Sequence, residues 1–163
     1  MRFFCIFSIL KNLFTYLLLF ISKILYTQNG EYFVRNYLPK EYNSHANNFD
    51  ICQDNDGKIF VANANGILIY DGFNWTLNKS REEDYVLSVF KSSKNVIYYS
   101  LDETRDFGVF EQLKNGKYVY TSIRNNIKDN EQPKEPIKQI FEHNNAIYFL
   151  SSDKIVEYRN NEF

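Results

Sequence analysis

Cysteine is almost absent from this chain of 163 residues, which contains only two. Cys5 lies in an apolar N-terminal stretch and Cys52 in an expected strand, so loss of the N-terminus would leave a single thiol. A disulfide framework is therefore excluded. We expect Cys52 to be a buried and unreactive thiol, as free cysteines in folded proteins usually are.

The sequence also lacks a basic surface of the kind that binds nucleic acids. The net charge is −1, and Arg2, Lys11 and Lys23 are the charged residues of an N-terminal stretch that contains no acid. Without these three cations the rest of the chain is acidic. Because nucleic-acid-binding domains present a basic face or stripe, we expect no nucleic-acid partner for this segment.

Motifs for catalysis and for metal binding are missing as well. The only histidines, His45 and His143, are far apart and lack the spacing of zinc ligands. No serine lies in a G-x-S-x-G context, and the glycines have hairpin spacing instead of forming a phosphate loop. Asp54-Asn55-Asp56-Gly57 resembles the start of a calcium loop, but without a later acidic ligand it favours a turn. We therefore predict no metal, no cofactor and no catalytic residue, and expect that the chain is not an enzyme.

Aromatic residues, in contrast, are abundant. The chain has 15 Phe and 13 Tyr, and 18% of its residues are aromatic. This composition favours pleated strands, and the scarcity of alanine weakens a helical interpretation. The length corresponds to roughly one domain.

Residues 1–27 are typical of a secretory signal segment. A basic start is followed by an apolar run over residues 13–21 and by the polar change Thr27-Gln28-Asn29-Gly30. We predict an exported, periplasmic protein, with cleavage before Gln28. An A-x-A cleavage site is missing, so the alternative is an uncleaved membrane anchor. Lys11 and Lys23 leave an apolar span shorter than the roughly 20 residues that cross a membrane. Membrane contact is expected only through residues 1–27.

The most regular stretch is residues 58–77, K-I-F-V-A-N-A-N-G-I-L-I-Y-D-G-F-N-W-T-L. Three short apolar runs are separated by the turn Asn63-Ala64-Asn65-Gly66 and by the two-residue hairpin signal Asp71-Gly72. Asn-Gly and Asp-Gly favour such turns because glycine adopts a positive φ without steric cost. This pattern predicts most of one antiparallel β-meander.

The same order of strands and polar turns recurs twice more. Ile59, Ile97 and Ile147 are equivalent points at intervals of about 40 to 50 residues, a spacing typical of β-propeller blades, and a charged insertion at 124–135 lengthens the second interval. One small sheet cannot bury both of its faces, so neighbouring blades would cover them. The sequence predicts an all-β fold after the N-terminal hydrophobic signal helix. In residues 28–163 we expect about three four-stranded antiparallel blades of an incomplete β-propeller, at 49–78, 86–122 and 137–163.

A candidate strand at residues 31–38 precedes the first blade and ends at Pro39, which cannot donate to a ladder. Known propeller rings need four or more blades. We therefore expect a longer parent protein, in which the remaining blades and downstream domains are partners of this segment. The alternative is a small open meander that is complete in itself. Three blades expressed alone would expose sheet edges, so we expect aggregation.

Several segments together resemble the two-component-regulator propeller, namely Asn36-Tyr37, Tyr42, residues 53–57, residues 65–72 with Trp75, and residues 106–110. More closely, over roughly residues 32–120, they resemble the opening of exported Bacteroidetes-type sensor proteins. This resemblance implies a periplasmic propeller followed by a tyrosine-rich β-sandwich and a transmembrane helix. It also implies a cytoplasmic output, either a histidine kinase or a helix-turn-helix regulator.

Ligands of propellers meet the loops that surround the central channel. Here these loops are expected at residues 43–48, 63–65, 81–84 and 103–106, and their polar side chains suit hydrogen bonds to a glycan or another polar ligand. The candidate ligand-binding residues are Asn47, Asn48, Asn63, Asn65, Arg81, Glu103 and Arg105. Trp75 with Tyr70 and Phe73 could stack on a carbohydrate, although packing between blades is the favoured interpretation.

These observations predict a non-catalytic, exported sensor, which is the ligand-recognition part of a signal-transduction regulator. Binding at the ring face would be relayed by changed packing against the following domains. One alternative is part of an exported propeller enzyme that acts on polysaccharide, with Asp84, Glu103 and Asp106 as the acids near the channel. Another is a structural interaction module that a partner chain completes.

Overall fold

The structure is a computed structural model that describes residues 11–17, 33–80 and 83–160. The chain divides into two units, Met1–Asn36 and Tyr37–Phe163. In the first unit, residues 11–17 are helical and residues 33–36 have no regular structure. Within the described ranges, no helix is long and apolar enough to cross a membrane. The rest of the predicted signal segment, residues 1–10 and 18–27, lies outside the described residues.

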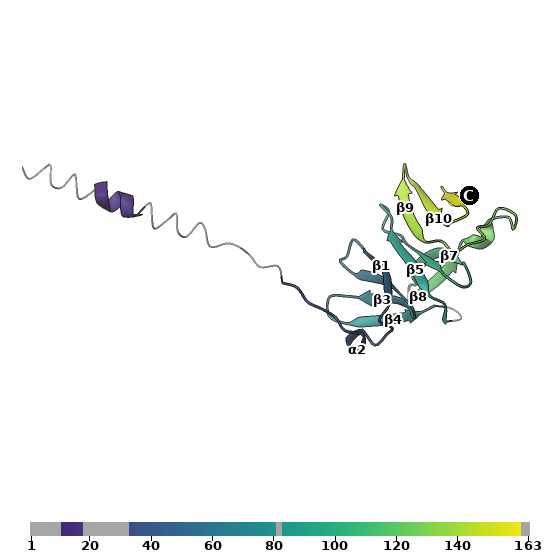
Figure 1. Cartoon of the computed structure of the whole chain (residues 1–163), viewed down its shortest axis with the longest axis horizontal. Helices are drawn as coiled ribbons and strands as arrows, with labels where there is room; N and C mark the ends of the chain where they lie inside the picture. The colour runs from purple at the N-terminus through teal and green to yellow at the C-terminus, as the bar shows by residue number, and fades with distance from the viewer. Residues whose placement is uncertain (1–10, 18–32, 81–82, 161–163) are drawn as a thin grey trace, which may run out of the picture. The chain divides into compact units, whose positions relative to one another are not determined.

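The second unit contains three small antiparallel sheets that follow one another along the chain (Figure 1). After helix α2 (Pro39–Tyr42), the first sheet consists of β1 (Asn48–Gln53), β2 (Ile59–Asn63), β3 (Gly66–Tyr70) and β4 (Trp75–Lys79). The second sheet consists of β5 (Val86–Lys91), β6 (Ile97–Leu101), β7 (Phe107–Gln112) and β8 (Tyr118–Ser122). After the 3-10 helix η2 (Arg124–Asn126), the third consists of β9 (Gln139–His143), β10 (Ala146–Leu150) and β11 (Ile155–Tyr158). The predicted all-β fold of successive blade-like sheets is confirmed.

Asparagine in the left-handed region allows one of the tightest turns. Asn144 and Asn145 connect β9 to β10, and their φ angles are 49° and 61°. A type I′ turn needs two such residues, and asparagine tolerates this conformation better than most side chains. The local sequence therefore determines this hairpin.

The two-residue turn predicted at Asp71-Gly72 is wrong. Tyr70 pairs with Trp75, so the four residues 71–74 join β3 to β4. The Asp71 carboxylate stabilises this longer loop by accepting hydrogen bonds from the backbone N–H groups of Phe73 and Asn74, at 2.8 and 2.7 Å. The carboxylate thus determines the loop length as much as the glycine does.

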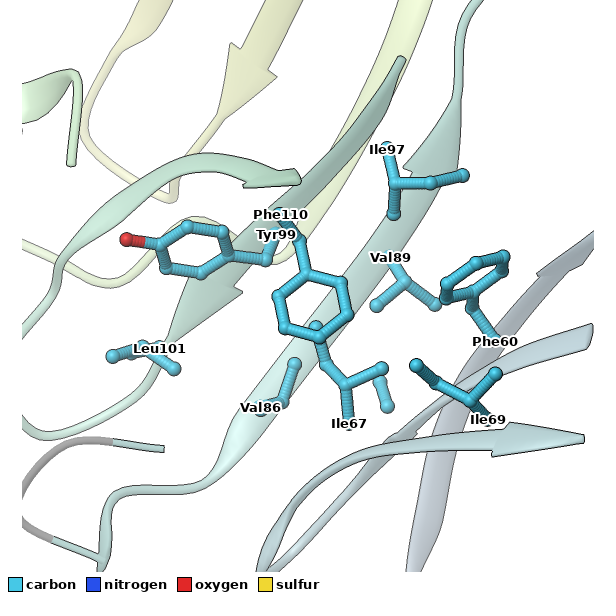
Figure 2. Packing of buried hydrophobic residues seen from close by; sticks show 10 residues of the cluster. Phe60, Ile67, Ile69, Val86, Val89, Ile97, Tyr99, Leu101 and Phe110 are labelled. Atoms are coloured by element: carbon cyan, nitrogen blue, oxygen red, sulfur yellow. The ribbon is translucent and has the colours of Figure 1, made fainter. Parts of the chain in front are cut away.

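Apolar side chains from alternate strand positions fill the space between the first and second sheets (Figure 2). Phe60 of β2 is 1% exposed, and its ring lies edge-on to Phe110 at 6.3 Å and to Tyr118 at 5.9 Å. Cys52 borders this core, and burial, with the nearby Asp50 and Asp54, raises the pKa of its thiol to about 12. Cys52 is thus half-buried and not fully buried as predicted, and its thiol stays protonated at neutral pH.

A second apolar cluster joins the second sheet to the third. The ring of Phe149 lies 4.7 Å from that of Phe107 and 5.9 Å from that of Tyr98. The Ser100 hydroxyl also donates a hydrogen bond of 2.8 Å to the Ile137 carbonyl oxygen. The middle sheet therefore has both faces covered, as a propeller blade does.

A half-buried tyrosine adds a polar bridge between the first two sheets. The Tyr120 hydroxyl of β8 accepts a hydrogen bond from the Ile67 N–H at 2.9 Å and donates one to the Asn78 carbonyl oxygen at 2.7 Å. Both partners belong to the β3–β4 pair. A side chain of the second sheet thus satisfies backbone groups of the first.

The strand predicted at residues 31–38 is absent from its described part, residues 33–38. Pro39 begins α2, and the Glu41 carboxylate accepts a hydrogen bond of 2.6 Å from the Leu38 N–H, so the backbone turns into the helix. Tyr37 instead donates a hydrogen bond of 3.0 Å to the Tyr70 hydroxyl and places its ring 5.3 Å from that of Trp75.

These rings cover the face of the first sheet opposite to the Phe60 core. Tyr42 from α2 also approaches Trp75, at 5.8 Å between ring centroids, over the buried side chains of Val61 and Leu68. Trp75 therefore packs within its own sheet and against Tyr37 and Tyr42, and not between two of the described sheets. Phe73, in contrast, is 90% exposed.

Gly66, at the start of β3, leaves no room for a side chain against the backbone of β4. It has a φ of 136°, and an added Cβ atom would lie 2.2 Å from the Asn78 carbonyl oxygen. We expect Gly66→Ala to lower the free energy of unfolding by about 2–3 kcal/mol, because the backbone of β4 would have to move. Gly72→Ala is the matched control, since its φ of 97° is also positive but a Cβ there meets no atom within 4 Å. Urea denaturation of both variants measures the difference, and equal losses would contradict this explanation.

Candidate ligand-recognition site

The antiparallel strands place their loops at two opposite ends of the sheets. The turns after β2 and β6 and the segments leading into β1 and β5 lie at one end, which we call the Asn63 end (residues 43–48, 63–65, 80, 83–85 and 101–106). The turns after β1, β3, β5 and β7 lie at the other, which we call the Lys58 end. Six of the seven predicted ligand-binding residues belong to the Asn63 end, and the seventh, Arg81, lies outside the described residues.

Asn63 is fully buried and organises the loop that precedes β1. Its amide nitrogen lies within hydrogen-bonding distance of the His45 carbonyl oxygen (2.7 Å), the Asn47 carbonyl oxygen (3.1 Å) and Asn48 Oδ1 (2.7 Å). Its Oδ1 accepts hydrogen bonds from the Ser44 hydroxyl (2.7 Å) and the Asn65 N–H (3.0 Å). Asn63 therefore has no exposed polar atom that could contact a ligand, contrary to the prediction of direct contact. Its side chain instead positions the neighbouring residues of the loop.

Asp84 plays the same part for the loop between β6 and β7. Its buried carboxylate accepts hydrogen bonds from the N–H groups of Glu103 and Thr104, both at 2.8 Å, and from the Thr104 hydroxyl at 2.6 Å. Its backbone carbonyl accepts a further hydrogen bond from the Ser80 hydroxyl. Asp84 thereby fixes the position from which Glu103 reaches solvent.

Asp106 is likewise surrounded by donors. Its carboxylate accepts hydrogen bonds from the Tyr99 hydroxyl (2.9 Å), the Ser122 hydroxyl (2.5 Å) and the Phe107 N–H (2.9 Å). The carboxylates of Asp84 and Asp106 thus both hold loops and strands in place. Of the three acids that the enzyme alternative would use, Asp84, Glu103 and Asp106, the exposed one is Glu103.

Two aromatic rings are exposed side by side at this end. Phe49 and Tyr85 are 45% and 44% exposed, and their rings stack with 6.4 Å between centroids and 27° between planes. The register of β1 shifts between Asn48 and Asp50, which makes Phe49 the extra residue of a β-bulge. Bulges redirect side chains and are frequent near functional sites. The alternation of apolar and polar residues does not reveal this shift, and the signal in the sequence was an aromatic residue directly after the polar loops 43–48 and 81–84.

The structure brings most of the predicted residues together around this pair. Asn47 and Asn48 precede Phe49, and the Asn47 carbonyl accepts a hydrogen bond of 3.2 Å from the Ala64 N–H, next to Asn65. The Tyr85 carbonyl accepts one of 3.0 Å from the Asp102 N–H, on the loop that carries Glu103 and Arg105. Among the predicted residues, those with exposed side chains are Asn47, Asn48, Asn65, Glu103 and Arg105. Arg81 lies outside the described residues.

Comparison with known proteins finds likeness in structure only. No protein-family model and no curated protein matches the chain. A virginiamycin B lyase from Staphylococcus aureus is 17% identical, with a TM-score of 0.49, over 78% of this chain and 45% of the lyase. A streptogramin B lyase is 21% identical, with a TM-score of 0.49, over 71% and 41%. A Bacteroides caccae protein of unknown function is 12% identical, with a TM-score of 0.46, over 70% and 46%. The chain thus spans less than half the length of these propeller-like structures.

One prediction is overturned by these comparisons. The expectation that the chain is not an enzyme is contradicted, because the similar structures include virginiamycin B lyases, which are enzymes. The lack of short catalytic motifs does not by itself exclude an enzyme, since catalytic residues are often carried by separate loops of a fold. At 17% to 21% identity, the likeness concerns the fold alone and assigns no chemistry to this chain.

Proposed function

We propose that this chain supplies the ligand-recognition propeller of an exported signalling protein of the two-component-regulator type. In this proposal, a glycan or a similarly polar ligand binds at the Asn63 end, and the bound state alters packing against the rest of the parent protein. The basic and apolar residues 1–27 support export. The resemblance of residues 53–57, 65–72 and 106–110 to the two-component-regulator propeller supports the signalling assignment.

The exposed Phe49–Tyr85 pair is the observation that carries the binding proposal. Aromatic side chains with this much exposed surface are uncommon away from binding sites when they lie together. Their rings provide flat apolar surfaces for the C–H faces of a sugar, while the amide and charged groups of the surrounding loops suit its hydroxyl groups. The buried side chains of Asn63 and Asp84 hold those loops in place before binding, which reduces the entropy cost of association.

Phe49→Ala is the direct test. We expect a screen of neutral and acidic oligosaccharides to identify a ligand of the 163-residue chain, and we expect Phe49→Ala to weaken its binding at least about tenfold in calorimetric titration. Phe73→Ala is the matched control, because it removes an exposed phenylalanine from the Lys58 end. Equal affinities of the two variants, with unchanged melting temperatures, would refute binding at the Asn63 end.

A further inference from the structure

Two hollows lie between the first and second sheets, and both extend to the Lys58 end. Their volumes are about 370 Å³ and 290 Å³, and both are lined by Lys58, Gln112 and Tyr118. The Lys58 ammonium group lies 3.4 Å from the Tyr118 hydroxyl and forms a bridge between the sheets. Pockets of small ligands start at about 300 Å³, so the larger hollow has room for a single sugar-sized molecule.

The larger hollow contains a buried donor that lacks a partner. Asn78 is one of the residues that line the hollow, and its buried Nδ2 has no hydrogen-bond acceptor among the described residues. Leaving such an amide unsatisfied costs about 1–3 kcal/mol, so an acceptor oxygen supplied by a ligand would relieve this cost. Thr76, whose hydroxyl can donate or accept, lies on the same wall. The wall therefore favours a ligand rich in oxygen atoms.

The charges of the larger hollow favour an anion. Lys58 and Lys117 provide two ammonium groups, while Asp71 provides the one carboxylate of its lining. The oxygen atom Asp71 Oδ1 is already bound by the N–H groups of Asn74 and Phe73, and these hydrogen bonds lower the pKa of Asp71. Asp71 therefore stays ionised at neutral pH, and the lining has a net charge of about +1, counting each lysine as charged.

The smaller hollow has the opposite character. Its lining contains Asp54, Asp56 and Glu111 together with Lys58. Three carboxylates against one ammonium group would repel an anion, so the charge pattern directs a ligand's carboxylate to the larger hollow. A ligand with a carboxylate at one end should therefore bind with that end in the larger hollow.

We propose that the larger hollow is a binding site for a small, hydroxylated carboxylate of the uronic-acid class. Its carboxylate lies between the Lys58 and Lys117 ammonium groups, and a ring oxygen or hydroxyl oxygen accepts the hydrogen bond of Asn78 Nδ2. This site is separate from the Asn63 end and does not depend on the function proposed there. Because its walls belong to both sheets, its occupation stabilises the contact between them.

D-Glucuronate is the probe, and D-glucose is the control ligand with the same ring but no carboxylate. We expect the 163-residue chain to bind glucuronate with a Kd below about 10 mM in calorimetric titration and to bind glucose at least tenfold more weakly. Added salt should weaken glucuronate binding, since both lysines are near solvent. Absence of glucuronate binding, or equal binding of both sugars, would overturn the proposal.

Variants locate the site. We expect Lys117→Met to weaken glucuronate binding at least tenfold, while Lys114→Met, on the same β7–β8 loop but outside the hollow lining, leaves it unchanged. Asn78→Ala should also weaken binding while preserving the melting temperature of the free protein, since its donor has no partner to lose. Equal effects of the two lysine variants would place the ligand elsewhere and refute this site. Phe49→Ala should leave glucuronate binding unchanged, which keeps this test separate from that of the Asn63 end.

Discussion

We expect Phe60→Ala to lower the free energy of unfolding of the three-sheet unit by about 3–5 kcal/mol, which is the usual cost of truncating a buried phenylalanine. Phe60 is 1% exposed and reaches across the interface to Phe110 and Tyr118, which belong to the second sheet. The two rings it contacts are themselves stacked, 5.1 Å apart at 15°, so they are poorly placed to close the cavity. Most of the cavity would therefore remain.

The expected loss also reflects how the sheets depend on one another. Each small sheet hides an apolar face on its neighbour, so a cavity in the interface weakens both sheets. Equilibrium urea denaturation, followed by tyrosine and tryptophan fluorescence, measures the effect. Phe73→Ala, at a phenylalanine that is 90% exposed, should change the stability by less than about 0.5 kcal/mol. A similar loss in both variants would show that the sheets do not stabilise one another through this interface.

We expect Asn63→Ala to lower the free energy of unfolding by about 2–4 kcal/mol, because it leaves several buried polar groups without partners. The amide of Asn63 connects β2 to the loop of residues 43–48 through four hydrogen-bonding contacts, and it makes a fifth with the Asn65 N–H. Water can reach some of the released groups on the exposed loop, which limits the loss. The loop should become more mobile even where the sheets stay folded.

Two measurements separate these effects of Asn63→Ala. Urea denaturation reports the stability, and hydrogen exchange should show faster exchange of the backbone N–H groups around residues 63–65, where the Ala64 N–H binds the Asn47 carbonyl. Asn65→Ala is the matched control, because Asn65 is an exposed asparagine two residues away. If both variants were equally stable, the buried network would contribute nothing to the fold. If the network holds the recognition loop, Asn63→Ala should also weaken glycan binding at the Asn63 end.

The architecture was predictable because much of it depends on local rules. Apolar runs of strand length, separated by polar turn residues and repeated along the chain, determine small antiparallel sheets. The left-handed pair Asn144-Asn145 shows how a hairpin follows from two adjacent residues alone. Turn length is harder to predict where a side chain binds the backbone of the turn. The Asp71 carboxylate does this and stabilises a four-residue loop in place of the predicted two-residue turn.

The predicted binding residues illustrate the limit of this reasoning. Polar residues in loops look alike in the sequence, whether they reach solvent or satisfy buried backbone groups. Asn63 and Asn65 are two residues apart in one turn, yet the first is fully buried and the second is exposed. The strand expected at residues 31–38 failed for a related reason, because a strand needs a partner, and Tyr37 instead packs against Trp75.

By itself, then, the sequence determined that this protein folds as successive small β-sheets with an apolar N-terminal segment before them, since strand periodicity and turn chemistry depend on neighbouring residues. Only the tertiary structure decided which polar side chains hold loops, how a bulge exposes Phe49 beside Tyr85, and where Lys58, Asn78 and Lys117 line one hollow. These features arise between strands that are distant along the chain. Their relative placement is determined by the packing of whole sheets, and no local pattern encodes it.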